Sequence, residues 1–445
     1  MRYAKYNELC SSDFAWLQDF PRHWRIKRLK FSTALVNEKV SVEESPLSYL
    51  GLEHIESWTG RRIDGEISNS EGLASSFLAS DVLFGKLRPY LAKVHLAQQG
   101  GLISSEALVV RSNEELHAEF LKYYMLSRDF INIVDSSTYG SKMPRASWDF
   151  IGNLPVLLPE VTEQQAIARF LDFKTAQIDA LIAKKKTLLE KLAEKRTALI
   201  SHAVTKGLDP SVEMKDSGLA WLGKVPSHWK VIPIKFSLAI PITDGPHSTP
   251  QFYDDGIPFL SAESVKNDRL DFSRMRGHIS EDDHAMFSKK YKPKYGDVYM
   301  VKSGATTGAV ARVETHDEFN IWSPLAVLRP HSEKSLTDYL FYVLKSKPFF
   351  YSVELSWSYG TQQNIGMGVI SNIRMALPPL NEQEQICSHL EPLLQKVEDQ
   401  KSKIDSVIDR LMEYRSSLIT NAVTGKIDVR DFPIPAPTAK EVCHA

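Results

Sequence analysis

Cysteine is scarce in this sequence, because only Cys10, Cys387 and Cys443 occur among 445 residues. Three cysteines, odd in number and far apart, exclude a disulfide framework and are typical of a reducing compartment. Long hydrophobic runs are also missing: no stretch approaches the roughly 18 apolar residues of a membrane-spanning helix. The N-terminal stretch lacks the apolar core of a signal peptide. We therefore expect a cytoplasmic protein with no membrane association.

The sequence has no excess of charge of either sign. Its formal net charge is −1 at pH 7, whereas a protein that binds nucleic acid unaided usually carries a clear basic excess. An apolar fraction of 43% and a charged fraction of 24% are typical of a soluble globular protein. The length favours about three domains over one. The composition therefore disfavours a nucleic-acid binder that works alone.

Motifs for common catalytic chemistry are missing too. Residues 218–224 have the glycine and lysine spacing of a phosphate-binding loop, but Val225 stands where a Ser or Thr would hold magnesium. The sequence has no His-Glu-x-x-His, no close Cys/His cluster and no Gly-x-Ser-x-Gly. It also lacks the Gly-x-Gly-x-x-Gly and the Asn/Asp-Pro-Pro-aromatic segments expected of a base methyltransferase. We therefore predict no catalytic residue and no metal site in this chain.

Two long stretches have the pattern of amphipathic helices. Residues 162–206 contain neither glycine nor proline, and their apolar residues recur at helical spacing. Residues 381–425 repeat the element, with apolar residues seven apart from Val397 to Leu418. The first stretch carries nine basic and five acidic residues, and the second carries five and eight. Heptad spacing and opposite net charge predict a coiled coil between the two helices.

Pro392 lies inside the second helical stretch. Proline suits the first turn of a helix, so we predict that a short helix ends before it and the main helix begins there. The main helix would then be roughly 50 Å long. Gly207 and Gly425 stand where a glycine would end each long helix.

The rest of the chain is duplicated as well. Residues 12–31 and 217–236 are identical at nine of twenty positions. Shorter matches continue at drifting offsets, so the chain is a tandem repeat of a domain followed by a long helix, too large for a solenoid. We predict a first domain at 1–160, its helix at 161–206, a linker at 207–225, a second domain at 226–379, its helix at 380–425 and a flexible tail at 426–445.

Each predicted domain has a mixed pattern. Short β-branched and aromatic runs alternate with Gly, Pro, Asn and Asp turns, which indicates strands. A short helix is expected at 119–127 in the first domain and at 336–346 in the second. The predicted fold class is therefore α+β, with two homologous α/β domains separated by two long helices.

Polar loops recur at matching places in the two domains. They combine glycine with hydroxyl, amide and basic side chains, the groups that contact DNA bases and phosphates. Gln or Asn can form two hydrogen bonds with the edge of adenine, and Arg or Lys can form two with the edge of guanine. An ordinary polar turn explains any single loop equally well, but the recurrence favours recognition. The candidate DNA-binding residues are Lys86, Arg88, Tyr90, Tyr139, Ser141, Lys142 and Arg145 in the first domain, and His247, Ser248, Thr249, Lys302, Ser303, Thr306, Thr307, Tyr359, Thr361, Gln362, Gln363 and Asn364 in the second.

The duplicated segments contain two Trp-Leu…Pro-x-His-Trp boxes, two Leu-Pro…Glu-Gln-x-x-Ile helix starts and two Arg-x-x-Leu-Ile…Ala-Val-Thr helix ends. These motifs resemble those of the specificity (S) subunits of type I restriction–modification systems, and the likeness spans residues 12–428. The resemblance implies two target recognition domains, each of which reads one half of a split double-stranded DNA target. It also implies that the two helices run antiparallel and that the molecule has pseudo-two-fold symmetry.

The resemblance further implies partners that supply the chemistry. Two modification subunits would bind S-adenosylmethionine and methylate adenine N6, and restriction subunits would bring ATP, magnesium and DNA cleavage. No cofactor is then expected on this chain. Trp24, Trp229, Arg196 and Arg415 become candidate partner contacts, although core packing explains the two tryptophans equally well. Near-neutral charge then fits a chain whose partners provide many phosphate contacts.

Two other functions are compatible with the sequence. A non-DNA coiled-coil scaffold with two protein-binding domains would change partners, and not sequence preference, when a domain is exchanged. An enzyme with unrecognised motifs would bind S-adenosylmethionine or cleave DNA as an isolated chain.

Overall fold

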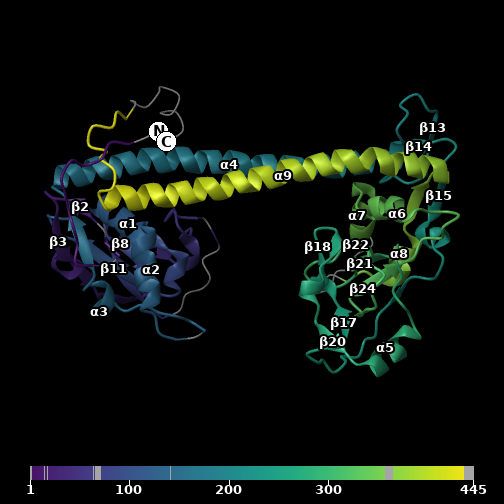
Figure 1. Ribbon diagram of the computed structural model, residues 1–445, viewed down its shortest axis with the longest axis horizontal. Coiled ribbons are helices and arrows are strands. Elements are labelled where there is room, and N and C mark those ends of the chain that lie inside the picture. The colour runs from purple at the N-terminus through teal and green to yellow at the C-terminus, as the bar shows by residue number, and fades with distance from the viewer. Residues whose placement is uncertain are drawn as a thin grey trace. The chain divides into compact units, whose positions relative to one another are not determined.

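The computed structural model of the chain (Figure 1) describes residues 3–14, 16–17, 19–63, 65, 72–140, 142–355 and 364–434. It divides into two compact units. Unit 1 consists of Met1–Lys186 with Asp405–Ala445, and unit 2 consists of Thr187–Ile404. Each boundary falls inside a long helix. Each unit therefore contains one mixed α/β domain and one half of each helix.

The two long helices are α4 (Val161–Lys206) and α9 (Leu380–Val423). They confirm the predicted helical stretches within two residues. Both end at a glycine with positive φ, 75° at Gly207 and 72° at Gly425, which is the left-handed stop that glycine allows without strain. Close packing adds to the requirement at Gly425, where a Cβ would lie 2.1 Å from Cδ of Pro21.

The predicted break at Pro392 was wrong, because α9 continues through that residue. A proline inside a helix loses one hydrogen bond and strains one turn, at a cost of about 3 kcal/mol. Pro392 is exposed, while Leu390 before it and Val397 after it are both buried. Burial of the apolar seam on both sides of the proline offsets that cost and keeps the helix in one piece.

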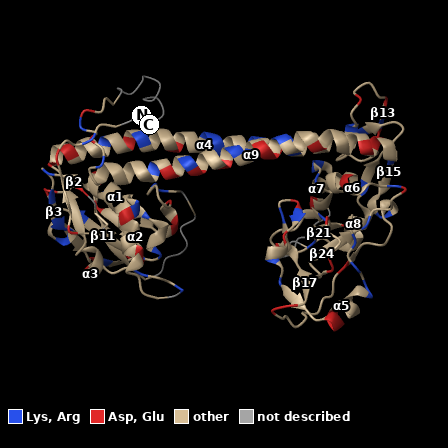
Figure 2. Cartoon of the chain, in the orientation of Figure 1, with Lys and Arg blue, Asp and Glu red and all other residues tan. Residues whose placement is uncertain are grey.

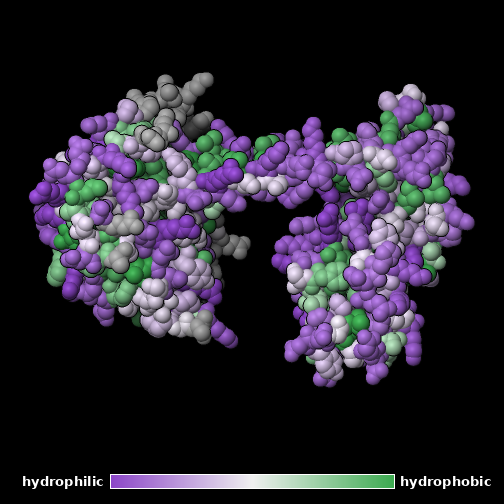
Figure 3. Space-filling model, in the orientation of Figure 1, coloured by the Kyte–Doolittle hydropathy of each residue, from purple (hydrophilic) through white to green (hydrophobic). Residues whose placement is uncertain are grey.

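Within each unit the halves of α4 and α9 lie antiparallel (Figure 1). Most apolar heptad positions predicted to face the partner helix are buried, as with Ile178 and Leu418 in unit 1 and Leu192, Val397 and Ile404 in unit 2. Leu199 and Leu411 are half-buried. Lys and Arg are interspersed with Asp and Glu along both helices (Figure 2). Hydrophilic residues cover most of the visible face of each unit (Figure 3).

The domain of unit 1 is built on two four-stranded sheets of order β4-β11-β8-β9 and β5-β7-β10-β6, with smaller pairs β12-β3 and β1-β2. Its strands are β1 (Leu9–Cys10), β2 (Phe20–Pro21), β3 (Arg25–Arg28), β4 (Thr33–Val36), β5 (Lys39–Ser41), β6 (Tyr49–Leu50), β7 (Leu73–Phe77), β8 (Val82–Gly85), β9 (Val94–Leu96), β10 (Gly101–Ile103), β11 (Ala107–Ser112) and β12 (Pro155–Leu158). Its helices are α1 (Ala118–Leu126), α2 (Arg128–Ser136) and α3 (Trp148–Ile151).

The domain of unit 2 has a six-stranded sheet of order β16-β24-β21-β22-β19-β18, a three-stranded sheet β20-β17-β23, and pairs β15-β25 and β13-β14. Its strands are β13 (Met214–Asp216), β14 (Lys224–Pro226), β15 (Lys230–Pro233), β16 (Thr243–Asp244), β17 (Ile257–Leu260), β18 (Val265–Lys266), β19 (Arg269–Leu270), β20 (Gly277–Ile279), β21 (Val298–Val301), β22 (Val310–Arg312), β23 (Asn320–Ile321), β24 (Leu325–Leu328) and β25 (Arg374–Leu377). Its helices are α5 (Glu281–Ser288), α6 (Thr337–Leu344), α7 (Lys347–Glu354) and α8 (Met367–Asn372).

The mixed α+β prediction is confirmed, and α1 and α6 confirm the two expected short helices. Two segments fold differently from expectation. The predicted linker at 207–225 contains β13 and the beginning of β14, and these two strands pair as an antiparallel hairpin. The first part of the predicted flexible tail is packed in unit 1, where Val429 is 3% exposed and Asp428 forms a β-bridge with Ala4. The prediction of flexibility was therefore wrong for residues 426–432, because apolar residues in that segment cover the helix ends.

A buried glutamine near the start of each long helix explains the repeated Glu-Gln motif. The amide nitrogen of Gln164 donates to the carbonyl oxygens of Glu115 and Pro159, each at 2.8 Å. Its carbonyl oxygen accepts from the backbone N–H of His117 at 2.7 Å. These bonds fix the helix start to the domain. The same three bonds join Gln383 to Lys334, Pro378 and Leu336.

The glutamate beside each glutamine holds the histidine of the Pro-x-His-Trp box. His23 Nε2 lies 2.9 Å from Glu163 Oε2, and His228 Nε2 lies 2.6 Å from Glu382 Oε1. In unit 2 the indole N–H of Trp229 also donates to Glu382, at 2.8 Å. The box therefore anchors the helix to the domain through these side chains.

Candidate nucleic-acid interface

Two of the polar loops lie side by side in unit 1. The backbone N–H of Arg88 donates to the carbonyl oxygen of Pro144 at 2.8 Å, and that of Ala146 donates to Lys86 at 3.0 Å. Leu87 and Arg145 form a β-bridge between the loops. Segments more than 50 residues apart in the sequence thus form one polar surface. The backbone of Arg88 is in the left-handed region at φ 51°, a conformation that non-glycine residues seldom adopt unless the surroundings hold it.

Unit 2 repeats this arrangement. The backbone N–H of Ile365 donates to the carbonyl oxygen of Lys302 at 2.7 Å, and Ser303 forms a β-bridge with Asn364. A third segment completes the match, since the N–H of Lys302 donates to Pro324 at 2.8 Å, as that of Lys86 does to Glu106 in unit 1. The two units therefore bring equivalent loops together through equivalent backbone hydrogen bonds. Ser141, Tyr359, Thr361, Gln362 and Gln363 lie outside the described residues.

The third candidate loop of unit 2 is joined to the second through Asp244. Its carboxyl group is 1% exposed, and one of its oxygens lies 2.6 Å from the ammonium nitrogen of Lys290. The other oxygen lies 3.3 Å from the ammonium nitrogen of Lys302 and 3.3 Å from Nε2 of His247. Burial raises the pKa of Asp244, but the hydrogen bond and charge of Lys290 and the charge of Lys302 outweigh it and leave the pKa below its usual value. The ionised carboxylate therefore fixes Lys302, whose side chain is only 12% exposed.

Arg145 has a comparable acidic partner in unit 1. Its guanidinium donates two hydrogen bonds to Glu106, at 2.9 and 3.0 Å. These bonds lower the pKa of Glu106, although partial burial opposes them. A carboxylate thus orients one basic side chain at each loop surface, and neither Glu106 nor Lys290 was among the predicted residues. The sequence carried no signal for them because their partners are distant in the chain.

The remaining candidates differ in how far they are exposed. Side chains open to solvent are the ones that can reach a base edge or a phosphate. Lys39, which the sequence did not indicate, lies beside Lys86, and burial together with the charge of Lys86 lowers its pKa. The exposed candidates are Arg88, Tyr90, Tyr139, Lys142, His247, Ser248, Thr249, Thr306 and Asn364, and the partly buried ones are Lys86, Arg145, Lys302, Ser303 and Thr307.

The four predicted partner contacts are occupied within their own units. Trp24, Trp229 and Arg415 are 4%, 1% and 7% exposed, so their side chains belong to the interior. Arg196 pairs with Asp268 of its own domain. All four side chains thus take part in the packing of their own units, and their contact with partner subunits stays a prediction.

Among the described residues, no group of three or more His, Cys, Asp or Glu side chains could hold a metal ion. In the same part of the chain, no helix is long and apolar enough to cross a bilayer.

A model of the type I restriction modification DNA specificity domain matches residues 240–409. Along nearly the whole chain, the specificity subunit of the type I restriction enzyme MjaVIII from Methanocaldococcus jannaschii is 22% identical, over 93% of this chain and 95% of its own length. The chain is therefore similar to type I specificity subunits along nearly its whole length, and residues 240–409 match the DNA specificity domain. The EcoKI specificity subunit of Escherichia coli is also 22% identical, over 72% of this chain and 68% of its own.

The fold of this chain recurs in solved structures. A chain in a structure described as showing complex assembly and conformational transition of the type I R-M system has a TM-score of 0.68 and 21% identity. The match covers 92% of this chain and 99% of that one. The EcoDI specificity subunit of Escherichia coli is 28% identical over 37% of this chain and 38% of its own.

Proposed function

We propose that this chain is the DNA-reading subunit of a type I restriction–modification complex, in which each domain reads one half of a split double-stranded target. The repeated loop arrangement carries this proposal, since equivalent hydrogen bonds place a polar surface in each unit. The side chains at the two surfaces differ, for example Arg88 and Lys142 in unit 1 against Thr306 and Asn364 in unit 2. The two half-sites should therefore differ, and the whole target should be asymmetric.

Direct contact with base edges would come from the exposed residues of each surface. Asn364 can form the two hydrogen bonds that select adenine, and Arg88 or Lys142 can select guanine or bind phosphate. Glu106 and Asp244 would act as positioning residues, because each fixes a basic side chain and the loop that carries it. A loop held in this way loses less conformational entropy when it binds.

Partner subunits would supply the chemistry and much of the affinity. A net charge of −1 gives the lone chain little of the counterion release that drives most protein–DNA binding. We infer that modification subunits carry S-adenosylmethionine and methylate adenine N6, that restriction subunits use ATP and magnesium, and that this chain is not catalytic. Its isolated DNA binding should be weak and highly sensitive to salt.

The length of α4 and α9 would set the gap between the half-sites, because both helices run without a break from one unit into the other. Deleting seven residues from each helix, 181–187 with 400–406, shortens the helical connection by about 10.5 Å. We expect the gap to shrink by about three base pairs while both half-sites stay the same. An unchanged gap would contradict this role of the helices.

The function is tested by mapping N6-methyladenine across the genome of cells with and without the gene. A split motif should appear only with the gene. Arg88→Ala should then relax the first half-site alone, and Asn364→Ala the second alone, so each variant serves as the control for the other. A motif that does not depend on the gene, or variants that change both halves alike, would count against the proposal.

The two alternatives have separate signatures. A protein-binding scaffold predicts that exchanging the loops of one domain changes the captured partner and leaves the methylated motif alone. An enzyme predicts that the purified chain binds S-adenosylmethionine, which equilibrium dialysis would detect.

A further inference from the structure

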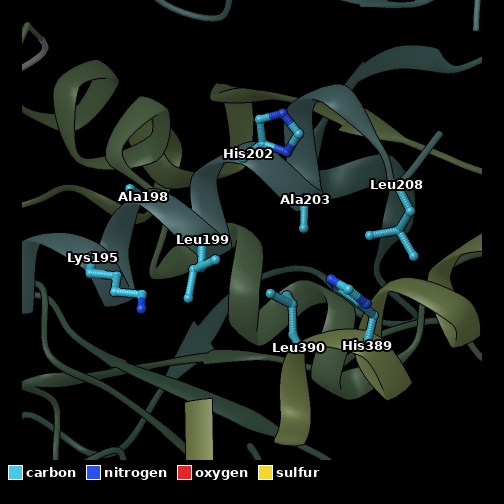
Figure 4. Close-up of a pocket in the computed structure, with 8 residues that line it drawn as sticks. All are labelled: Lys195, Ala198, Leu199, His202, Ala203, Leu208, His389 and Leu390. Carbon is cyan, nitrogen blue, oxygen red and sulfur yellow. The ribbon is translucent and has the colours of Figure 1, made fainter. Parts of the chain in front are cut away.

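An open groove lies between α4 and α9 in unit 2, with a volume of about 240 Å³. Leu199 and Ala203 of α4 point toward Leu390 and His389 of α9 (Figure 4). Sites for small molecules usually measure roughly 300–1,000 Å³, so this groove suits one large side chain better than a cofactor. Its lining residues are Lys195, Ala198, Leu199, His202, Ala203, Leu208, His389 and Leu390.

The internal repeat places an equivalent groove in unit 1. Each lining residue has a counterpart 219 positions away, as with Phe170 for His389 and Tyr414 for Lys195. The other counterparts, taken in the order of the lining residues, are Ser417, Leu418, Asn421, Ala422, Ile427 and Leu171.

In unit 1 this equivalent groove is filled by aromatic residues from the two chain ends. The hydroxyl of Tyr3 lies 3.1 Å from that of Tyr414, and its ring centroid lies 5.4 Å from that of Phe170. The ring centroid of Phe432 lies 4.9 Å from that of the same Phe170, and the ammonium of Lys174 lies over the Phe432 ring, 4.9 Å from its centroid. Two extended segments thus cover the helix pair with aromatic side chains.

The chain path explains why the groove of unit 2 stays open. Unit 1 contains both chain ends, whereas unit 2 is entered from α4 by a continuous chain that turns at Gly207 into β13. When the chain is instead aligned by the repeat of residues 12–31 at 217–236, the counterpart of Tyr3 is Leu208, which is 40% exposed. The counterpart of Phe432 is Glu213, whose carbonyl oxygen accepts from Ser227 beside the hairpin. The described part of unit 2 therefore has no aromatic residue in the position of Phe432.

We propose that the groove of unit 2 receives an aromatic side chain from an extended segment of a partner protein, with a carboxylate next to the ring. We expect an aromatic side chain because aromatic side chains fill the equivalent groove of unit 1. The carboxylate follows from charge, since Lys195, His202 and His389 stand where unit 1 has Tyr414, Asn421 and Phe170. This proposal does not depend on what the loop surfaces read.

A second copy of this chain is a poorer occupant. Its matching segment, residues 427–434, is already bound in its own unit 1 through Val429, which is 3% exposed, and through Phe432. Releasing that segment would uncover Phe170 and Leu171 of the donor, both fully buried, so transfer between copies gains no net contact.

The test uses the full chain and a fluorescently labelled peptide with the sequence of residues 427–434, IDVRDFPI. Anisotropy should show saturable binding to one site per chain. Replacing Phe by Ala in the peptide should weaken binding at least tenfold, and Ala198→Trp, which fills the groove from an exposed helix position, should do the same. Lys401→Glu, a change at an exposed residue about three helical turns along α9 from the groove, is the control and should stay within twofold. Absent binding, or equal affinity for all these pairs, would overturn the proposal.

Two further measurements check that the variant folds and locate the bound peptide. Thermal unfolding of Ala198→Trp should match that of the parent, and Leu199→Phe provides a second groove-filling variant if it does not. A benzoylphenylalanine peptide should cross-link to 195–203 or 389–390. Cross-links to 414–427 would instead mean that the peptide displaces the chain's own segment. Self-association that Ala198→Trp abolishes would assign the groove to a second copy. Either result would overturn the proposal.

Discussion

Arg415 and Asp179 form an ion pair inside unit 1, with Nε and Oδ1 2.9 Å apart and side chains only 9% and 10% exposed. Arg415 also donates to the carbonyl oxygen of Trp58 at 2.8 Å, in a turn where φ is 65°. In unit 2 the matching Arg196 pairs with Asp268, whose φ is also 65°. One arginine near the end of each long helix therefore holds a left-handed turn of the adjoining domain.

Arg415→Ala should destabilise unit 1 strongly, because it leaves Asp179 buried without its partner. Breaking a buried pair in this way costs about 3–5 kcal/mol. Arg196→Ala should cost less in unit 2, since that pair is about a quarter exposed. Hydrogen exchange resolves the two units separately, which a single unfolding curve would not.

The exposed Arg410 on α9 provides the control for Arg415. Arg410→Ala should change stability by less than about 0.5 kcal/mol. The double variant Arg415→Ala with Asp179→Ala should be less destabilised than the sum of the single variants. Additive effects would mean that the two side chains do not depend on each other.

Gln383→Ala should loosen the start of α9. The change removes three hydrogen bonds from a fully buried side chain and leaves buried backbone groups unsatisfied, at a cost of about 1–3 kcal/mol. Gln385→Ala, two residues along and exposed, is the matched control and should have little effect. Denaturant unfolding of both variants measures the difference, and equal stabilities would refute the role given to the buried glutamine.

Asp244 gives unit 2 a pH dependence with a defined sign. Its pKa lies below the usual 3.8 in the folded chain, so its ionisation stabilises the fold above about pH 4 and this contribution is lost as the pH falls through the lower, folded-state pKa. Asp244→Asn should therefore cost stability at pH 6 and much less at pH 2. Denaturation at both pH values tests this, and a cost that does not change with pH would contradict it.

Phe432→Ala should destabilise the end of α9 and the start of α4. The ring is partly buried and packs edge-on against Phe170, so its loss should cost about 1–3 kcal/mol. Phe236→Ala removes a ring that is 55% exposed and is the control. Faster hydrogen exchange at 161–175 in the first variant alone is the expected result.

The sequence predicted the long helices and their pairing because heptad spacing and glycine stops are local signals. It could not reveal that burial around Pro392 would keep α9 continuous, since that depends on residues of another helix and domain. The candidate polar loops were identified because they recur at matching places in the two domains, and the structure brings them together within each unit. Glu106 and Lys290 were missed, because a carboxylate or ammonium in a polar stretch has no visible partner until β-strands bring distant segments together. Val429 and Phe432 were assigned to a flexible tail because prolines nearby dominate the local pattern.

The division of both helices between the units has a consequence for synthesis on the ribosome. Phe170, Leu171 and Ile178 emerge from the ribosome long before Leu418 and Ala422, which belong to the same core. The apolar surface of the first domain must therefore stay uncovered until α9 has been made. A message cut short anywhere before the end of α9 would leave that domain incomplete and open to degradation, so the cell would not accumulate the truncated protein.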